Sequence, residues 1–178
     1  MDVYFVTGNE NKVREAEQIL GMKLNHRAIE LDELQEMDAD KISEHKVRQA
    51  WSVIKAPLFV SDMSLHIDCL NGFPGPLVKW FWTTVSLEKI CKIAGLLGNK
   101  GITAKNTLTY FDGKTVRHFY GTIRGTIPSE PRGNMGFGWD PVFVPEGKSK
   151  TYAEMTAEEK SDCSAYRSVL LQLKPYLK

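Results

Sequence analysis

The sequence is poor in the features that mark a disulfide-stabilised, zinc-binding or membrane-spanning protein. Its 178 residues contain three cysteines, Cys69, Cys91 and Cys163, which are widely spaced and form no CxxC pair. Isolated cysteines indicate a reducing compartment and argue against a disulfide framework or a zinc cluster. No segment has the apolar length of a membrane span, and no basic stretch precedes an apolar run at the N-terminus. The sequence therefore predicts a soluble, cytoplasmic protein without a membrane partner.

An excess of either charge is also missing, since 23 lysines and arginines face 22 acidic residues for a formal net charge of +1. A dedicated nucleic-acid binder normally carries a basic excess, so we expect any bound phosphate to belong to a small molecule. Internal repeats, low-complexity tracts and linkers are lacking too. With 42% hydrophobic residues, the chain is predicted to form a single domain over residues 1–178, or two closely joined lobes.

Strands and helices alternate in the first half of the chain. Periodicity predicts strands at Val3–Val6, Lys23–Leu31 and Pro57–Val60, the last ending in Ser61-Asp62, with Leu65, Ile67 and Cys69 alternating beyond it, and helices after Asn9 and from about Lys41 to Lys55.

The second half is predicted to contain more strand. A helix should run from an N-cap at Ser86 to Leu97 and stop at Gly98. A hairpin should turn at Asp112-Gly113, and a capping box at Thr156–Glu159 should start a late helix. The mixture predicts the α/β class.

The stretch Gly133–Glu159 concentrates glycines, aromatics and carboxylates without a regular period. Glycines allow close backbone approach, and Phe137 and Trp139 offer flat apolar faces beside the carboxylate of Asp140. A planar ligand with polar edges would suit this stretch. The alternative is a turn-rich hairpin whose aromatic residues fill the core.

A second candidate site lies near the N-terminus, where a strand, the turn Thr7-Gly8-Asn9 and a helix start follow one another. Unpaired N–H groups and the helix dipole favour an anion there, and Lys12 in the first turn is poorly placed for the dipole unless an anion compensates it. A phosphate would do so. The alternative is an Asn cap with a solvated lysine.

Four separate motifs identify a family. The segments TGNENK at Thr7–Lys12, LNGFPGP at Leu70–Pro76 followed by Lys79–Phe81, FGWDPVF at Phe137–Phe143 and KTYAEMTAEEK at Lys150–Lys160 resemble the inosine triphosphate pyrophosphatase family. They occur in family order along nearly the whole chain.

The resemblance implies an enzyme that hydrolyses the non-standard purine nucleoside triphosphates ITP, dITP and XTP. The products are the monophosphate and pyrophosphate, the cofactor is Mg²⁺ and the role is sanitation of the nucleotide pool. The implied fold is an elongated mixed central sheet flanked by helices, with the active-site cleft between two lobes, assembled as a homodimer. Two alternatives stay open: a non-catalytic nucleotide-binding protein of the same fold, and a pyrophosphatase with another base preference.

The resemblance also implies the site residues. Glu33 and Asp62 would hold the metal, and Asp62 would accept a proton from the attacking water, with Lys12 as the second catalytic residue. Arg167 would donate to O6 of the purine. The implied substrate-binding positions are Thr7, Gly8, Asn9, Lys12, Lys46, Lys79, Phe137, Gly138, Trp139, Asp140, Lys160, Tyr166 and Arg167.

The chain departs from the family pattern at two places. The family's Ser-His-Arg is here Ser164-Ala165-Tyr166-Arg167, with one extra residue and tyrosine in place of histidine. The acidic pair usual before the substrate strand is reduced to Ser61-Asp62. Because Glu33, Asp62 and Lys12 are retained, we expect activity, with base selectivity and the number of metal ions as the properties most affected.

Overall fold

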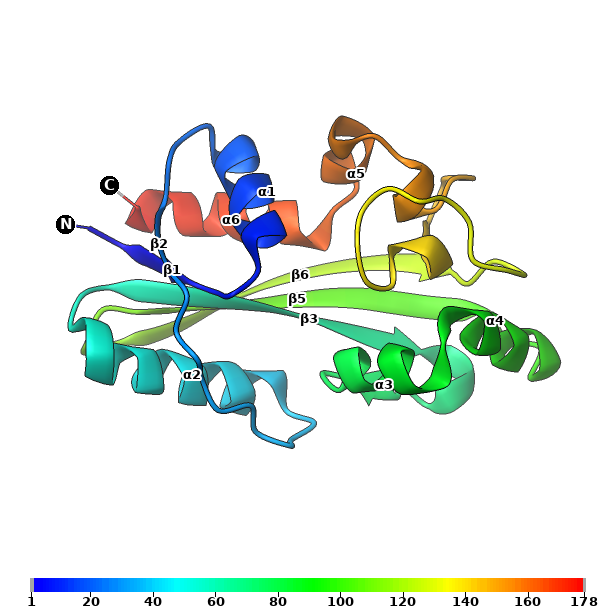
Figure 1. The fold of residues 1–178 in the computed structure, drawn as a ribbon, viewed down its shortest axis with the longest axis horizontal. Helices are drawn as coiled ribbons and strands as arrows, with labels where there is room; N and C mark the ends of the chain where they lie inside the picture. The colour runs from blue at the N-terminus through cyan, green and yellow to red at the C-terminus, as the bar shows by residue number, and fades with distance from the viewer. Residues whose placement is uncertain (1, 178) are drawn as a thin grey trace. The chain divides into compact units, whose positions relative to one another are not determined.

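The computed structural model describes residues 2–177, which form a mixed α/β fold with a seven-stranded sheet. Neighbouring strands follow the order β2-β1-β3-β5-β6-β7, and β4 pairs with β3 (Figure 1). The strands are β1 (Tyr4–Val6), β2 (Asn25–Arg27), β3 (Leu58–Ile67), β4 (Pro74–Gly75), β5 (Gly101–Phe111), β6 (Val116–Thr126) and β7 (Val144–Pro145). The α-helices are α1 (Glu10–Leu20), α2 (Ala39–Ile54), α3 (Val78–Val85), α4 (Leu87–Leu96), α5 (Ala157–Asp162) and α6 (Ala165–Leu173).

Four short 3-10 helices complete the chain: η1 (Asp68–Leu70), η2 (Asp140–Val142), η3 (Tyr152–Glu154) and η4 (Lys174–Tyr176). The predicted α/β class, with a mixed sheet flanked by helices, is confirmed.

The chain divides into two compact units. The first unit contains Met1–Asp62, Asn106–Gly121 and Tyr166–Lys178, and the second contains Met63–Lys105 and Thr122–Ala165. The predicted elongated shape and the cleft between lobes stay predictions.

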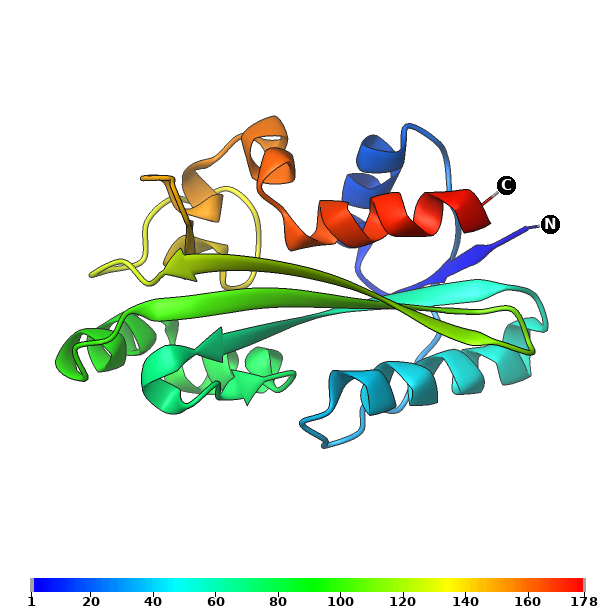
Figure 2. The ribbon, with the colours of Figure 1, turned by 180° about the vertical axis from the view of Figure 1, so that it is seen from behind.

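In the first unit, helices cover both faces of the strands. Strand β1 pairs in parallel with β2 and with β3, and α1 connects β1 to β2. Figures 1 and 2 show α1 and α6 on one face and α2 on the other. The α1–α6 side is closed by the buried side chains of Phe5, Ala16, Leu20, Phe59, Tyr166, Val169, Leu170 and Leu173, and the α2 side by Val6, Val47, Ala50, Leu58 and Val60.

The second unit has its own core beneath α3 and α4. Buried side chains of Leu65, Ile67, Ile102 and Ala104 from the strands meet Val78, Ile90 and Ala94 from the helices. Helix α3 was not predicted. It forms because Val78, Phe81, Trp82 and Val85 recur at helical spacing and pack toward this core.

Two predicted boundaries are wrong. Strand β3 does not end at Asp62 but continues to Ile67, because its later residues pair with β4 through Leu65 and Gly75. The strand expected at Lys23–Leu31 shrinks to β2. The Glu17 carboxylate binds the Lys23 ammonium at 2.7 Å and the Leu24 N–H at 3.1 Å, which ties the start of that segment to α1. The predicted N-cap of α4 at Ser86 is confirmed in position, although Ser86 has φ 68° and its side chain makes no capping hydrogen bond.

Other local predictions are confirmed. Thr156 and Glu159 form the capping box of α5. The Asp112 carboxylate accepts from the N–H groups of Lys114 and Thr115 at 2.9 and 2.7 Å in the turn between β5 and β6.

Candidate active site

The loop between β1 and α1 is held by its own side chains. The Asn9 side chain accepts from the N–H groups of Asn11 and Lys12 at 3.0 and 3.4 Å, so the Asn cap that the alternative interpretation proposed is present. The Thr7 hydroxyl accepts from the Asn9 N–H at 3.1 Å. Gly8 is exposed, and a Cβ added to it would meet no atom within 4 Å. The helix start therefore presents open space at its positive end, where an anion is favoured.

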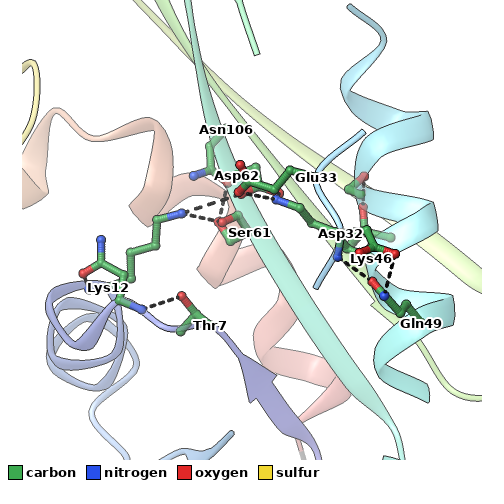
Figure 3. A network of polar contacts seen from close by, with 12 residues as sticks. Thr7, Lys12, Asp32, Glu33, Lys46, Gln49, Ser61, Asp62 and Asn106 are labelled. Carbon is green, nitrogen blue, oxygen red and sulfur yellow. Dashed lines mark hydrogen bonds and ion pairs between the residues drawn. The ribbon is translucent and has the colours of Figure 1, made fainter. Parts of the chain in front are cut away.

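Lys12 points from this helix start toward β3 and is not a solvated lysine. Its side chain is 19% exposed, and its Nζ lies 2.6 Å from the Ser61 carbonyl oxygen and 3.9 Å from Asp62 Oδ1. Figure 3 shows it reaching from α1 to the strand. An ammonium that is held this far from water is a strong partner for phosphate.

A second lysine approaches Asp62 from α2. The Lys46 side chain is 11% exposed, and its Nζ lies 3.0 Å from Asp62 Oδ2 and 3.5 Å from Glu33 Oε1. Two lysines and two carboxylates from four segments of the first unit thus form one cluster, which we call the Lys12–Asp62 cluster: Lys12, Glu33, Lys46 and Asp62 (Figure 3).

Glu33 lies in this cluster because its loop is hydrogen-bonded to α2. The Asp32 N–H donates to Gln49 Oε1 at 2.8 Å, and Gln49 Nε2 donates back to Asp32 Oδ2 at 3.0 Å. This double hydrogen bond places the Glu33 carboxylate, whose side chain is 50% exposed, beside Lys46.

The charges of the cluster shift one another's pKa values. Burial alone would raise the pKa of Asp62, but the charges of Lys12 and Lys46 outweigh it and the pKa lies below the usual value. Burial likewise favours a lower pKa for Lys46, yet Asp62 and Glu33 raise it overall. For Lys12, burial dominates and the pKa is lowered, with Lys46 adding repulsion against the attraction of Asp62. Asp62 is therefore ionised at neutral pH, and Lys12 is the cation that most gains from an incoming anion.

The lowered pKa of Lys12 predicts that the affinity for a triphosphate depends on pH. Lys12 carries its charge below its lowered pKa and loses it above, so triphosphate affinity should fall at an alkaline pH below the ordinary lysine value of 10.5. Lys12→Arg should move that fall to higher pH, because a guanidinium stays protonated. The measurement is the dissociation constant of one nucleoside triphosphate against pH for both proteins, in which the ligand's own titration cancels. Coincident curves would show that another group sets the alkaline limb.

The cluster fits a magnesium ion by its donor chemistry. Among residues 2–177, no group of three or more histidines, cysteines and carboxylates is arranged to hold a metal ion. Magnesium, however, commonly uses one or two protein carboxylates and takes its remaining ligands from water and substrate phosphates. Glu33 and Asp62, whose carboxylates both lie beside the Lys46 ammonium, supply that number.

Ser61 stands where the resemblance implies a second acid, and its side chain is not directed at the carboxylates. The Ser61 side chain is buried and donates to Asn106 Oδ1 on β5 at 2.9 Å. Its carbonyl, not its hydroxyl, serves the cluster by accepting from Lys12. Sequence reasoning missed this contact, because Asn106 lies between Lys105 and Thr107 and does not stand out as a buried polar residue.

In the second unit, the predicted aromatic loop is organised by Asp140. Its side chain is 3% exposed, and Oδ2 accepts from the Phe137 N–H at 2.9 Å and from Lys160 Nζ at 2.8 Å. Gly136 has φ 77°, and a Cβ there would lie 2.2 Å from the same oxygen. The Asp140 carboxylate, implied above to bind substrate, is engaged within the loop, where it holds Phe137 and Lys160 together. Its contact with a substrate stays a prediction.

The two aromatic residues of the loop have different surroundings. Trp139 is half-buried and packs edge-on against Phe143 at 5.5 Å between ring centroids, as the core-filling alternative expects. Phe137 is 37% exposed, and Lys160 Nζ lies 4.7 Å from its ring centroid. Gly138 follows with φ 63°. Phe137 is thus the ring with a face open to a planar ligand, and Lys160, also 5.4 Å from the Tyr152 ring, is the cation beside it.

The remaining predicted residues contribute no side chain to the Lys12–Asp62 cluster or to the loop around Asp140. Lys79 is exposed, with its Nζ 5.8 Å from the Trp80 ring centroid. Tyr166 is 5% exposed in the core of the first unit, and Arg167 is half-buried next to it on α6. The ring of Tyr166 packs inside, and its contact with substrate stays a prediction.

Residues 3–176 match the sequence model of the Ham1 family. The chain belongs to the Ham1 family. The family resemblance drawn from the four motifs is thereby confirmed.

Curated relatives of this Ham1-family chain extend over nearly its whole length. It is 39% identical to the inosine triphosphate pyrophosphatase of Kluyveromyces lactis, over 99% of this chain and 95% of the relative. It is 37% identical to the dITP/XTP pyrophosphatase of Saccharolobus solfataricus, over 88% and 83% of the two chains.

Solved structures agree on the fold. A Ham1 protein from Coxiella burnetii has a TM-score of 0.86 at 22% identity, over 99% of this chain and 98% of the other. Within residues 2–177, no helix is both long and apolar enough to cross a bilayer.

Proposed function

We propose that this Ham1-family chain is a Mg²⁺-dependent nucleoside triphosphate pyrophosphatase. It hydrolyses ITP, dITP and XTP between the α and β phosphates and releases the monophosphate and pyrophosphate, which removes non-standard purine nucleotides from the pool. The observation that carries the proposal is the convergence of Lys12 and Lys46, 19% and 11% exposed, on one ionised carboxylate, Asp62. The names of the relatives from Kluyveromyces lactis and Saccharolobus solfataricus supply the reaction and the bases.

The phosphates are proposed to bind at the start of α1. The Thr7-Gly8-Asn9 loop offers backbone dipoles and open space, and Lys12 adds a cation. Lys46 neutralises a further oxygen. Cations fixed where negative charge accumulates stabilise the transition state without reorganisation.

Glu33 and Asp62 are the residues proposed to hold Mg²⁺. Bound there, the ion would neutralise phosphate charge and polarise the phosphoryl group for attack. Lys46 lies within 3.5 Å of both carboxylates and is the side chain that would share them. Asp62, ionised at neutral pH, is proposed to accept the proton of the attacking water.

The purine is proposed to stack on the exposed face of Phe137, with Lys160 beside it. A site that offers donors to a 6-oxo group and no partner for a 6-amino group rejects adenine, because it leaves polar groups unpaired. Lys160 has donors only. Arg167 is the second proposed donor.

The deciding experiment is pyrophosphate release from ITP, XTP, dUTP, GTP and ATP, with and without Mg²⁺. We expect release from ITP and XTP that requires Mg²⁺ and exceeds release from ATP. Binding without release would identify a non-catalytic nucleotide-binding protein, and release with another order of substrates would identify a different base preference.

Base selectivity has its own test at Arg167. Arg167→Ala should reduce the ITP-over-ATP ratio of kcat/KM by about 1.5–3 kcal/mol, or roughly 10- to 100-fold, through loss of a charge-assisted hydrogen bond. Arg48→Ala is the control, since Arg48 is exposed and paired with Glu44 at 2.6 Å. An unchanged ratio in Arg167→Ala would leave base choice to the loop around Phe137.

The family resemblance also leads us to propose a cytoplasmic homodimer. Light scattering of the purified protein measures the assembly directly. A mass near 20.1 kDa would identify a monomer.

A further inference from the structure

The hydroxyl of Tyr166 contacts the main chain of the phosphate-binding lysine. Tyr166 Oη donates to the Lys12 carbonyl oxygen at 3.1 Å. The two residues are 154 positions apart in the sequence, yet both belong to the first unit, where α6 packs against α1. The bond therefore connects the last α-helix of the chain to the first turn of the helix that begins at the Thr7-Gly8-Asn9 loop.

With this bond, Lys12 is fixed at three separate points. Its N–H is capped by Asn9 at 3.4 Å, its ammonium donates to the Ser61 carbonyl at 2.6 Å, and its carbonyl accepts from Tyr166. A carbonyl in the first turn of a helix is normally used by the N–H four residues on. The tyrosine adds a second hydrogen bond, which restricts rotation of that turn.

Tyr166 is built for a fixed role and not for contact with a ligand. Its ring is 5% exposed and packs with Ala16, Leu20 and Leu170. Burial holds the pKa of its phenol well above the ordinary value, so the hydroxyl remains a proton donor throughout the working range. Histidine, which the family pattern places here, would instead titrate near neutral pH.

The arrangement of α6 separates Tyr166 from its neighbour. Successive residues on a helix are turned by about 100°, so Tyr166 faces α1 while Arg167 is half-buried on another side. Tyr166 therefore faces the interior of the first unit, whereas Arg167 is partly accessible.

We propose that Tyr166 is a positioning residue for Lys12, and that its hydroxyl orients the first turn of α1 so that the Lys12 ammonium meets the triphosphate. This inference rests on the proposed function for its ligand. It adds to that function a residue, Tyr166, that acts through the main chain of Lys12.

The test is the binding of inorganic tripolyphosphate, followed by calorimetry without turnover. Tyr166→Phe keeps the ring and removes the hydroxyl, and we expect it to weaken binding about three- to tenfold, which corresponds to one hydrogen bond. Tyr110→Phe is the matched control, since Tyr110 lies in the same core and its ring contacts Tyr176. That control should bind tripolyphosphate as the unmodified chain does.

A double-mutant cycle separates positioning from a general loss of packing. In a Lys12→Ala background, Tyr166→Phe should have no further effect on tripolyphosphate binding, because the side chain it positions is gone. Tyr166→Met, which fills the apolar space without a hydroxyl, should repeat the Tyr166→Phe result and serves if the phenylalanine variant does not fold.

Unchanged binding in Tyr166→Phe, with weaker binding in Lys12→Ala, would overturn the positioning role and leave the proposed function intact. An equal loss from Tyr166→Phe with and without Lys12 would overturn it as well. Unchanged binding in Lys12→Ala would overturn the phosphate site itself. Catalysis is tested separately by pyrophosphate release, so the two failures are distinguishable.

Discussion

Asp62→Asn should lower kcat for ITP by roughly 10²- to 10⁴-fold, the range typical of removing a general base. The amide keeps the size and shape of the carboxylate but carries no negative charge, so it is a far weaker proton acceptor and metal ligand. It also leaves Lys12 and Lys46 without their common counter-charge, since Asp62 lies 3.9 and 3.0 Å from the two ammonium groups. We therefore expect a lower thermal midpoint as well, partly restored by salt, which screens the repulsion between the lysines.

The comparison variant is Glu33→Gln. Its side chain is 50% exposed and lies 3.5 Å from Lys46, so its loss should disturb the lysines less. Because Glu33 is proposed to hold the metal, the Mg²⁺ concentration for half-maximal rate should rise more in Glu33→Gln than in Asp62→Asn. Near-normal turnover in Asp62→Asn would move the metal site elsewhere, and an unchanged Mg²⁺ requirement in Glu33→Gln would remove that residue from it.

The sequence was informative where function depends on local chemistry. Asparagine is among the preferred N-cap residues, and Asn9 caps α1, as the alternative interpretation of this turn proposed. Asp62 stands out as an acid two residues after the apolar run Leu58-Phe59-Val60, although the strand continues past it to Ile67. Lys12 was ambiguous because helix position alone does not say whether a lysine is solvated. Its contact with Ser61, 49 residues away, decides that question.

The sequence did not predict contacts between residues far apart in the chain, nor which of two nearby aromatic residues is exposed. Phe137 and Trp139 have the same chemistry and similar neighbours, yet Trp139 packs on Phe143 while Phe137 is 37% exposed. Tyr166 matched a substrate position by motif, but its hydroxyl bonds to Lys12 at a separation of 154 residues. The contact between Tyr166 and Lys12 follows from the packing of α6 on α1, which the hydrophobic periodicity of the two helices does not predict.

The second large effect is expected from a substitution of Asp140, whose carboxylate binds both the Phe137 N–H and the Lys160 ammonium. Asp140→Asn should raise KM for ITP strongly, because it removes the charge opposite Lys160, an ammonium whose side chain is only 14% exposed. Breaking a buried ion pair by removing one partner typically costs about 3–5 kcal/mol. Part of that cost should appear as loss of order around Phe137, whose N–H also depends on the same carboxylate oxygen.

The loss of affinity in Asp140→Asn should be confined to ligands that carry a base. Inorganic tripolyphosphate, which has no base, should bind Asp140→Asn with unchanged affinity, whereas ITP should bind much more weakly. Asp162→Asn is the control, since Asp162 is exposed at the end of α5, and it should behave as the unmodified chain toward both ligands. Equal weakening of both ligands by Asp140→Asn would show that the loop supports the whole protein. Normal ITP binding would show that neither Phe137 nor Lys160 needs to be held in place to receive the purine.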